Sequence, residues 1–232
     1  MHANNETGIV QPIIDIGEIL RSTESFFHSD IAQTYGKEVE ELRNAKCDFM
    51  SISGHKICGP QGIGALFVRR LSGRQRPLSS ITFGGGQERG LRPGTIPVPL
   101  VVGLGEAARI ALESIETRQE NAAKNRTILL SALASLEHSL NGDQERCQSH
   151  VLNVQFPGVD SEALMMATSE LLAFSNGSAC TSADYKLSHV LTAMQLDEDE
   201  CSESIRLSWS DGCLADFCET LISAVKRIES QF

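Results

Sequence analysis

The 232-residue sequence lacks the features of several broad protein classes. It has no low-complexity tract and no clear internal repeat, and prolines and charged residues break its most apolar segment, residues 96–112, so no membrane span is predicted. Basic residues are scarce: 20 Lys and Arg against 30 Asp and Glu give a formal charge of −10. This balance disfavours direct binding to nucleic acids or anionic membranes, whose phosphates repel an acidic protein.

Paired cysteines are also absent. The seven cysteines form no CxxC pair and show no regular spacing, which favours reduced thiols over a disulfide framework or a bound metal. The first residues, MHANNETG, have neither a basic nor an apolar stretch, so no secretory signal peptide is predicted there. We therefore expect a location in the cytoplasm or in a reducing organelle such as the mitochondrial matrix.

Residues 1–95 alternate short apolar runs with helical or turn segments, which predicts an α/β layer with a largely parallel sheet in a first domain over residues 1–112. A helix is expected over residues 12–20, and strands over 26–30, 47–53 and 63–70. Because sheets usually have about 5–6 strands, only about three before residue 95 indicate an incomplete domain.

Residues 113–232 predict a small α+β domain. A helical pattern from residue 98 to about 140 joins it to the first domain, and the boundary is placed near residue 112. The sequence then predicts a strand over 150–156, a helix over 160–172, a Gly/Ser-rich loop, a strand over 204–210 and a closing helix over 214–230.

Lys56 comes directly after a predicted strand, in SISGHKICGP. A lone lysine here is most simply a solvated charge at the edge of a loop. A Schiff-base lysine instead needs a cofactor whose charges are matched by the protein. Asp30 ends the preceding strand and is suited to a protonated pyridine nitrogen.

Four other polar residues fit the remaining groups of the same cofactor. Asn5 and Gln33 suit a phenolate oxygen, and Ser53 and His55 suit a phosphate. Each alone is more often a cap or turn residue. Together with the lysine and the acid they fit pyridoxal 5′-phosphate (PLP).

Six segments of the sequence carry recognisable motifs: MHANNETGIVQPI, FFHSDIAQTYGK, DFMSISGHKICGPQGIGALFVRR, GGGQERGLRPGT, SNGSACTS and SIRLSWS. In this order they resemble the motifs of the NifS/IscS-like cysteine desulfurases, which are class V, fold-type I PLP enzymes. The resemblance extends from the first residue nearly to the last. It implies an incomplete large α/β domain that binds PLP, followed by a small α+β domain that carries a catalytic cysteine loop.

The resemblance implies a role for each matching residue. Lys56 holds the cofactor and is catalytic, and Asp30 contacts the pyridine nitrogen. Gln33 and Asn5 lie near the ring oxygen, with Asn5 also near the substrate, and Ser53 and His55 bind the phosphate. Thr95 reaches the phosphate of a neighbouring subunit, which implies a homodimer. Arg206 holds the substrate carboxylate with its bidentate fork.

Cys180 lies among small, turn-forming residues in FSNGSACTSAD. Free cysteines are usually buried and inert, and this is our expectation for Cys47, Cys201, Cys213 and Cys218. The loop around Cys180 predicts an accessible thiol instead. The resemblance implies that Cys180 is catalytic and takes sulfur from L-cysteine as a persulfide. L-Alanine is then released, and a sulfur-acceptor protein for iron–sulfur cluster assembly or thiolation receives the sulfur.

The sequence departs from the family pattern in two places. The family's chains begin well before this one, so the histidine that stacks on the pyridine ring is expected to be absent, and SWSDG stands where the family has a glycine and a second arginine. Three hypotheses stay open: a cysteine desulfurase, a selenocysteine lyase, or a catalytically silent remnant that associates with a full-length desulfurase. We expect the isolated chain to bind PLP poorly.

Overall fold

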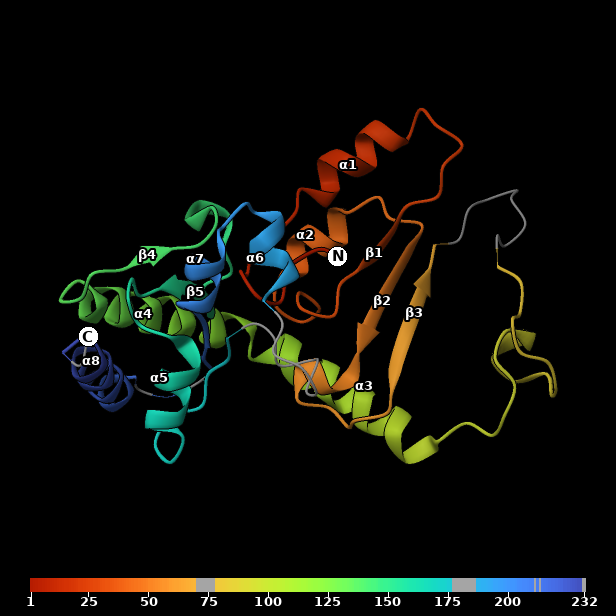
Figure 1. The fold of residues 1–232 in the computed structure, drawn as a ribbon. Coiled ribbons are helices and arrows are strands. Elements are labelled where there is room, and N and C mark those ends of the chain that lie inside the picture. Colours follow the sequence, from red (N-terminus) through yellow and green to blue (C-terminus); the bar gives the residue numbers. More distant parts are fainter. Residues whose placement is uncertain (70–77, 177–186, 211, 213, 231–232) are drawn as a thin grey trace. The chain divides into compact units, whose positions relative to one another are not determined.

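The computed structural model describes residues 1–69, 78–176, 187–210, 212 and 214–230 (Figure 1). The chain divides into two compact units. The first comprises Met1–His2 and Pro12–Ile115, and the second comprises Ala3–Gln11 and Glu116–Phe232. Residues 3–11, which the sequence assigned to the first domain, thus belong to the second unit. The functional boundary at residue 112 stays a prediction.

The first unit confirms the predicted helix and three strands, with shorter bounds. Pro12 precedes α1, as expected of a residue whose fixed φ suits a helix start. The short helix α2 was not predicted. The elements are α1 (Ile13–Leu20), β1 (His28–Asp30), α2 (Val39–Asn44), β2 (Phe49–Ser53), the 3₁₀ turn η1 (Gly54–Ile57), β3 (Gly64–Val68), η2 (Gln87–Gly90) and α3 (Val98–Glu113).

The sheet of the first unit has the strand order β1-β2-β3. Strands β1 and β2 are parallel, with Asp30 opposite Ser51, whereas β2 and β3 are antiparallel. The expectation of a largely parallel sheet is therefore wrong for the described strands. Residues 54–63 are too few for a parallel crossover, so β3 returns beside β2 in the opposite direction.

The second unit combines an antiparallel sheet, β4-β5-β6, with helices. The helical pattern predicted from residue 98 to about 140 is confirmed over most of its length, but it forms two helices and ends earlier: α3 ends at Glu113, and the next helix extends from Ile115 to Leu133. Ser114 leaves helical geometry there, and its Oγ donates to the carbonyl oxygen of Ile110 at 2.7 Å. The elements are α4 (Ile115–Leu133), β4 (Ser139–Leu140), η3 (Gln144–Arg146), β5 (Val151–Gln155), α5 (Ser161–Thr168), α6 (His189–Ala193), α7 (Glu198–Ser202), β6 (Ser204–Ser208) and α8 (Ala215–Glu229).

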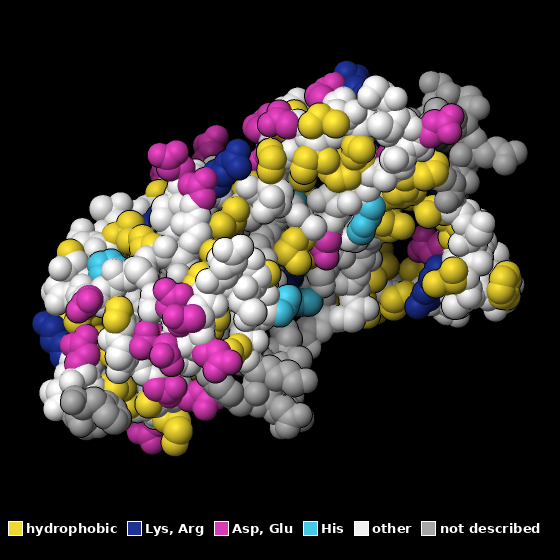
Figure 2. Space-filling view, turned by 45° about the horizontal axis from the view of Figure 1, so that its top comes forward, with side chains coloured by type: hydrophobic (Ala, Val, Ile, Leu, Met, Phe, Trp, Pro, Cys, Tyr) yellow, Lys and Arg dark blue, Asp and Glu magenta, His cyan; other side chains and the backbone are white. Residues whose placement is uncertain are grey.

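The two units differ in how much apolar surface they bury. In the second unit, fully buried residues of α4, β5, β6 and α8, such as Leu129, Leu152 and Leu221, form one large core. Among the described residues of the first unit, the buried cluster is small: Ile13, Ala45 and Cys47, with Phe27, Leu42 and Met50 packed against it. Figure 2 shows many hydrophobic side chains on the surface of that unit, among acidic and neutral residues. Within the described residues, no helix has both the length and the hydropathy that a membrane span requires.

Candidate cofactor and substrate site

The predicted cofactor residues of the first unit gather at one end of two parallel strands. Asp30 is the last residue of β1, and Ser53 is the last residue of β2. Since Asp30 pairs with Ser51, the turn that follows Ser53 lies beyond the same edge of the sheet. The carboxyl ends of parallel strands are the usual place for ligands in α/β folds.

The η1 turn directs His55 and Lys56 outward. Its other two residues, Gly54 and Ile57, are buried, whereas His55 and Lys56 are exposed. A Cβ on Gly54 would lie 3.0 Å from the carbonyl oxygen of Pro60, so the close return of the chain favours glycine. The Oγ of Ser53 and Nδ1 of His55 are 2.9 Å apart and share a hydrogen bond, which pairs the two residues predicted to bind phosphate.

The Asp30 side chain is held by its own turn. Its Oδ1 accepts a hydrogen bond from the backbone N–H of Ala32 at 2.9 Å, and the residue is exposed. Gln33 follows in the same turn and is half-buried. Thr95 is exposed in the segment before α3, and its contact with a second subunit stays a prediction.

Asn5 and Arg206, the two predicted substrate residues, are brought together within the second unit. Nη1 of Arg206 donates to the carbonyl oxygen of Asn5 at 3.0 Å. Nε of Arg206 is buried and has no hydrogen-bond partner among the described residues. An unpaired buried donor of this kind is costly unless a ligand or water satisfies it. The placement of this pair relative to Lys56 stays a prediction.

Two further contacts of the second unit flank the segment that contains Cys180. Cys180 itself lies outside the described residues. Before that segment, Ser175 forms a β-bridge with Arg206. After it, the Oγ of Ser188 donates to the carboxylate of Glu6 at 2.5 Å, and both side chains are buried. The Glu6–Ser188 pair was not predicted, because 182 positions of sequence separate the two residues and no local pattern joins them.

Three of the four cysteines expected to be inert are described, and all three are buried: Cys47, Cys201 and Cys218. Burial raises the pKa of the Cys47 and Cys201 thiols, which favours the unreactive thiol form. Cys213 lies outside the described residues. Over the described parts of the chain, no three His, Cys, Asp or Glu side chains form a metal-binding group.

The donor set at the strand ends fits PLP. Asp30 offers a carboxylate for a protonated ring nitrogen, the Ser53–His55 pair offers a hydroxyl and an imidazole for a phosphate, and Lys56 offers an exposed amine for the aldehyde. All four residues come from the carboxyl ends of β1 and β2.

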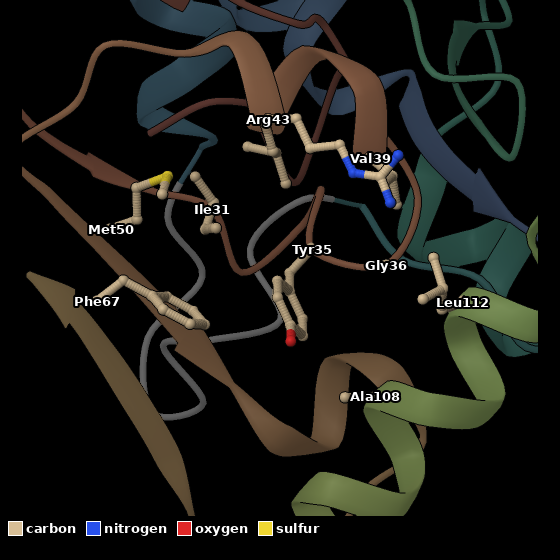
Figure 3. A pocket seen from close by; sticks show the side chains of 10 residues that line it. Ile31, Tyr35, Gly36, Val39, Arg43, Met50, Phe67, Ala108 and Leu112 are labelled. Carbon is tan, nitrogen blue, oxygen red and sulfur yellow. The ribbon is translucent and has the colours of Figure 1, made fainter. Parts of the chain in front are cut away.

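A separate pocket of about 270 Å³ lies in the first unit between strands β2 and β3, the turn after β1, α2 and α3 (Figure 3). Its walls are mostly apolar, and none of the predicted site residues lines it. Arg43 and the hydroxyl of Tyr35 are its main polar groups, so it does not offer the partners that PLP requires. The lining residues are Ile31, Tyr35, Gly36, Val39, Leu42, Arg43, Met50, Phe67, Ala108 and Leu112.

Comparison with known protein families matches residues 1–210 to the family described as aminotransferase class-V. The chain belongs to this family, within its IscS/NifS-like cysteine desulfurase group. The predicted family resemblance is therefore confirmed. The chain spans about half the length of the curated relatives it matches.

Three known proteins illustrate the similarity. The cysteine desulfurase IscS of Vibrio cholerae is 46% identical over 210 residues, which cover 90% of this chain and 51% of that protein. The NifS-like protein from Rickettsia africae matches with a TM-score of 0.85 at 30% identity, over 99% of this chain and 60% of that chain. The structure of SspA in complex with cysteine matches with a TM-score of 0.69 at 38% identity, over 89% of this chain and 56% of that chain.

Proposed function

We propose that this chain is part of a PLP-dependent cysteine desulfurase that removes sulfur from L-cysteine. The observation that carries the proposal is the convergence of Asp30, the Ser53–His55 pair and Lys56 at the carboxyl ends of two adjacent parallel strands. Membership of the cysteine desulfurase group supports the same reaction.

The residues of the first unit would hold the cofactor. Lys56 would hold the cofactor through Nζ, and the same atom would accept the α-proton of the substrate. The Asp30 carboxylate would hold the ring nitrogen and Gln33 the ring oxygen. Ser53 and His55 would hold the phosphate. When bound, PLP supplies an electron sink for the electrons that the α-proton leaves behind.

The residues of the second unit would bind substrate and receive its sulfur. The guanidinium of Arg206 binds the carboxylate of L-cysteine, which also gives the buried Nε a partner. Asn5, whose carbonyl oxygen orients Arg206, lies beside this carboxylate. The Cys180 thiolate would attack the substrate sulfur, so that an S–S bond forms on Cys180 and the Cβ–Sγ bond breaks. The electron pair of the broken bond stays on Cβ, which takes up a proton, and the carbon skeleton leaves as L-alanine.

The persulfide would then pass to a thiol of an acceptor protein, an iron–sulfur scaffold or a thiolation enzyme. A single carrier cysteine must transfer its sulfur before the next cycle, so an acceptor or an external reductant is required for turnover. The relative solved with bound cysteine supports L-cysteine as the substrate class. A selenocysteine lyase would release alanine faster from selenocysteine than from cysteine.

Substitution of the proposed cofactor lysine tests this function. Because weak binding is expected, wild-type chain titrated with PLP should gain the absorbance of lysine-bound PLP only at high PLP concentrations, and Lys56→Ala should not gain it. Lys226→Ala, which removes an exposed lysine of α8, is the matched control and should behave like wild type. Wild-type chain that gains no such absorbance even at the highest PLP concentration, or Lys56→Ala that gains as much as wild type, would contradict the proposal.

A further inference from the structure

His2 lies wholly buried beside the turn that carries Asp30 and Gln33. Its backbone N–H donates to the carbonyl oxygen of Asp30 at 2.7 Å, and its ring Nδ1 lies 2.8 Å from Oγ1 of Thr34. The exposed fraction of the His2 side chain is 0%. One residue thus contacts both ends of the turn, with Gln33 between the two contacts.

Other contacts also attach the ends of this turn. Asp30 pairs with Ser51 of β2, and the N–H of Ile31 donates to the carbonyl oxygen of Ser51 at 3.0 Å. The carbonyl oxygen of Thr34 accepts from the N–H groups of Lys37 and Glu38, both at 2.9 Å. His2 adds the contacts that join both ends of the turn to a segment distant in the sequence.

The two ring nitrogens of His2 face different partners. Nδ1 shares a hydrogen bond with the Thr34 hydroxyl, whose oxygen also lies 3.3 Å from the carbonyl oxygen of Ile31. Nε2 has no hydrogen-bond partner among the described residues and lies 3.4 Å from Oε1 of Glu41. The charges of Glu38 and of the N-terminal amine also act on the pKa of the ring, in opposite directions.

We propose that His2 is a positioning residue, which sets the place of the Asp30 carboxylate and the Gln33 side chain through its contacts with Asp30 and Thr34. This inference rests on the proposed function, because the two positioned side chains matter for reactivity only if they face PLP. Neither the composition of MHANNETG nor the position of His2 beside Asn4 and Asn5 predicted this role.

Hydrogen exchange at the Ala32 amide tests the inference, because this amide donates to the Asp30 carboxylate. Thr34→Val keeps the shape of the side chain and removes the partner of Nδ1, and His2→Gln places its amide toward Glu41 instead of Thr34. In both variants the Ala32 amide should exchange about tenfold faster, because the loss of one hydrogen bond lowers the cost of local opening by about this factor. His2→Asn, whose amide can replace Nδ1, should restore most of the protection.

Two controls separate positioning from general destabilisation. Glu40→Gln changes the neighbouring acid of α2, which pairs with Arg43 instead of His2, and should leave Ala32 exchange unchanged. Amides of the β2–β3 ladder should exchange at wild-type rates in every variant. The inference is wrong if the Ala32 amide exchanges as slowly in Thr34→Val and His2→Gln as it does in Glu40→Gln. It is also wrong if the exchange rates of the β2–β3 amides rise as much as the rate of the Ala32 amide.

The affinity for PLP, measured by its visible absorbance, is the second readout. It should fall about tenfold in Thr34→Val and in His2→Gln and recover in His2→Asn. Unchanged affinity in the first two variants would overturn the positioning role even if Ala32 exchange changed. If wild-type chain binds no PLP, the proposed function fails, whereas the exchange rate of Ala32 still decides whether His2 holds the turn.

Discussion

At the residue scale, three side-chain functions depend on neighbours that keep them in place. Gly54 leaves room for the backbone at Pro60 to pass close by, and the turn that Gly54 begins leaves the Lys56 side chain exposed to solvent. The carbonyl oxygen of Asn5 orients Arg206. His2 contacts the turn that contains Asp30. In each case the residue that we propose contacts the ligand is polar and exposed or half-buried, and the group that orients it is more deeply buried or part of the backbone.

The ionisation of His2 predicts a pH-dependent stability. Burial lowers the pKa of His2 below its ordinary value of 6.5, although Glu41 and Glu38 act in the opposite direction. The unfolded chain therefore binds this proton at a higher pH than the folded chain does. The free energy of unfolding contributed by neutral His2 is present above about pH 6.5 and is lost as the pH falls below it.

Urea denaturation at about pH 7.5 and about pH 5.5 measures this effect, since these values bracket the ordinary pKa of histidine. The loss of stability between the two should be smaller in His2→Asn, which has no ring to protonate, than in wild type. The titration of carboxylates changes the free energy of unfolding of both proteins by the same amount, so it cancels when the two proteins are compared. An equal loss in the two proteins would show that His2 does not titrate in this range.

Arg206→Lys should weaken the binding of L-cysteine to the PLP-loaded protein by about tenfold or more. Lysine keeps the charge but loses the two-pronged contact with a carboxylate and the Nη1 hydrogen bond to Asn5. The spectral change on titration with L-cysteine gives the affinity. Arg109→Lys is the matched control, because Arg109 is an exposed arginine of α3 that pairs with Glu106 and Glu113. Equal affinity of the two variants for L-cysteine would show that Arg206 does not bind the substrate.

At the element scale, one buried contact determines how α6 begins. The Oγ of Ser188 accepts hydrogen bonds from the backbone N–H groups of Val190 and Leu191, and its own hydrogen goes to the Glu6 carboxylate. The helix start is thereby attached to the turn that contains Asn5. Because Ser175 is joined to Arg206, both ends of the Cys180 segment are attached near the proposed substrate residues.

Ser188→Ala should therefore destabilise the second unit by about 2–3 kcal/mol, because it removes a helix cap and leaves the buried Glu6 carboxylate without this donor. Asp160→Ala removes the N-cap of α5, and Asp160 is exposed and caps the helix through the N–H of Ala163. This substitution should lower the free energy of unfolding by only about 1 kcal/mol. Urea denaturation of both variants gives the two values. Similar costs for the two caps would contradict the importance of the Glu6 contact.

At the scale of the whole molecule, the distribution of apolar surface differs between the two units. Ile81, Phe83 and Val102 of the first unit are 92%, 88% and 64% exposed, whereas the exposed large hydrophobic residues described in the second unit are Met166 and Leu171. Large exposed apolar surfaces usually mark contacts with another protein chain. Thr95, which we propose contacts a neighbouring subunit, lies within the same stretch of sequence.

We therefore expect self-association through the segment before α3 and the start of α3. Phe83→Asp and Val102→Asp should lower the molar mass measured by light scattering after gel filtration, because a charge at a buried contact is costly. Met166→Asp, which adds the same charge to an exposed site of the second unit, should leave the mass unchanged. Monomeric wild-type chain, or an equal effect of all three variants, would contradict this interface.

Much of the secondary structure near the site was predictable from local patterns. The strands that end near Asp30 and Ser53, the helix after Pro12 and the closing helix α8 all follow from apolar spacing and turn residues. The antiparallel direction of β3 and the break at Ser114 were not predicted. The first depends on the length of a connection, and the second depends on a side-chain hydrogen bond that competes with the helix.

The sequence by itself determined the family, the chemistry of the donor set and the position of Lys56 after a strand, because these depend on residue types and on neighbours close in the chain. Only the tertiary structure decided that Asp30 and Ser53 share one edge of a sheet, that Arg206 contacts Asn5, and that His2 holds the Asp30 turn. The physical reason is that strand pairing and buried hydrogen bonds join groups that are distant along the chain. Their partners are chosen by packing and by the need to satisfy buried polar atoms.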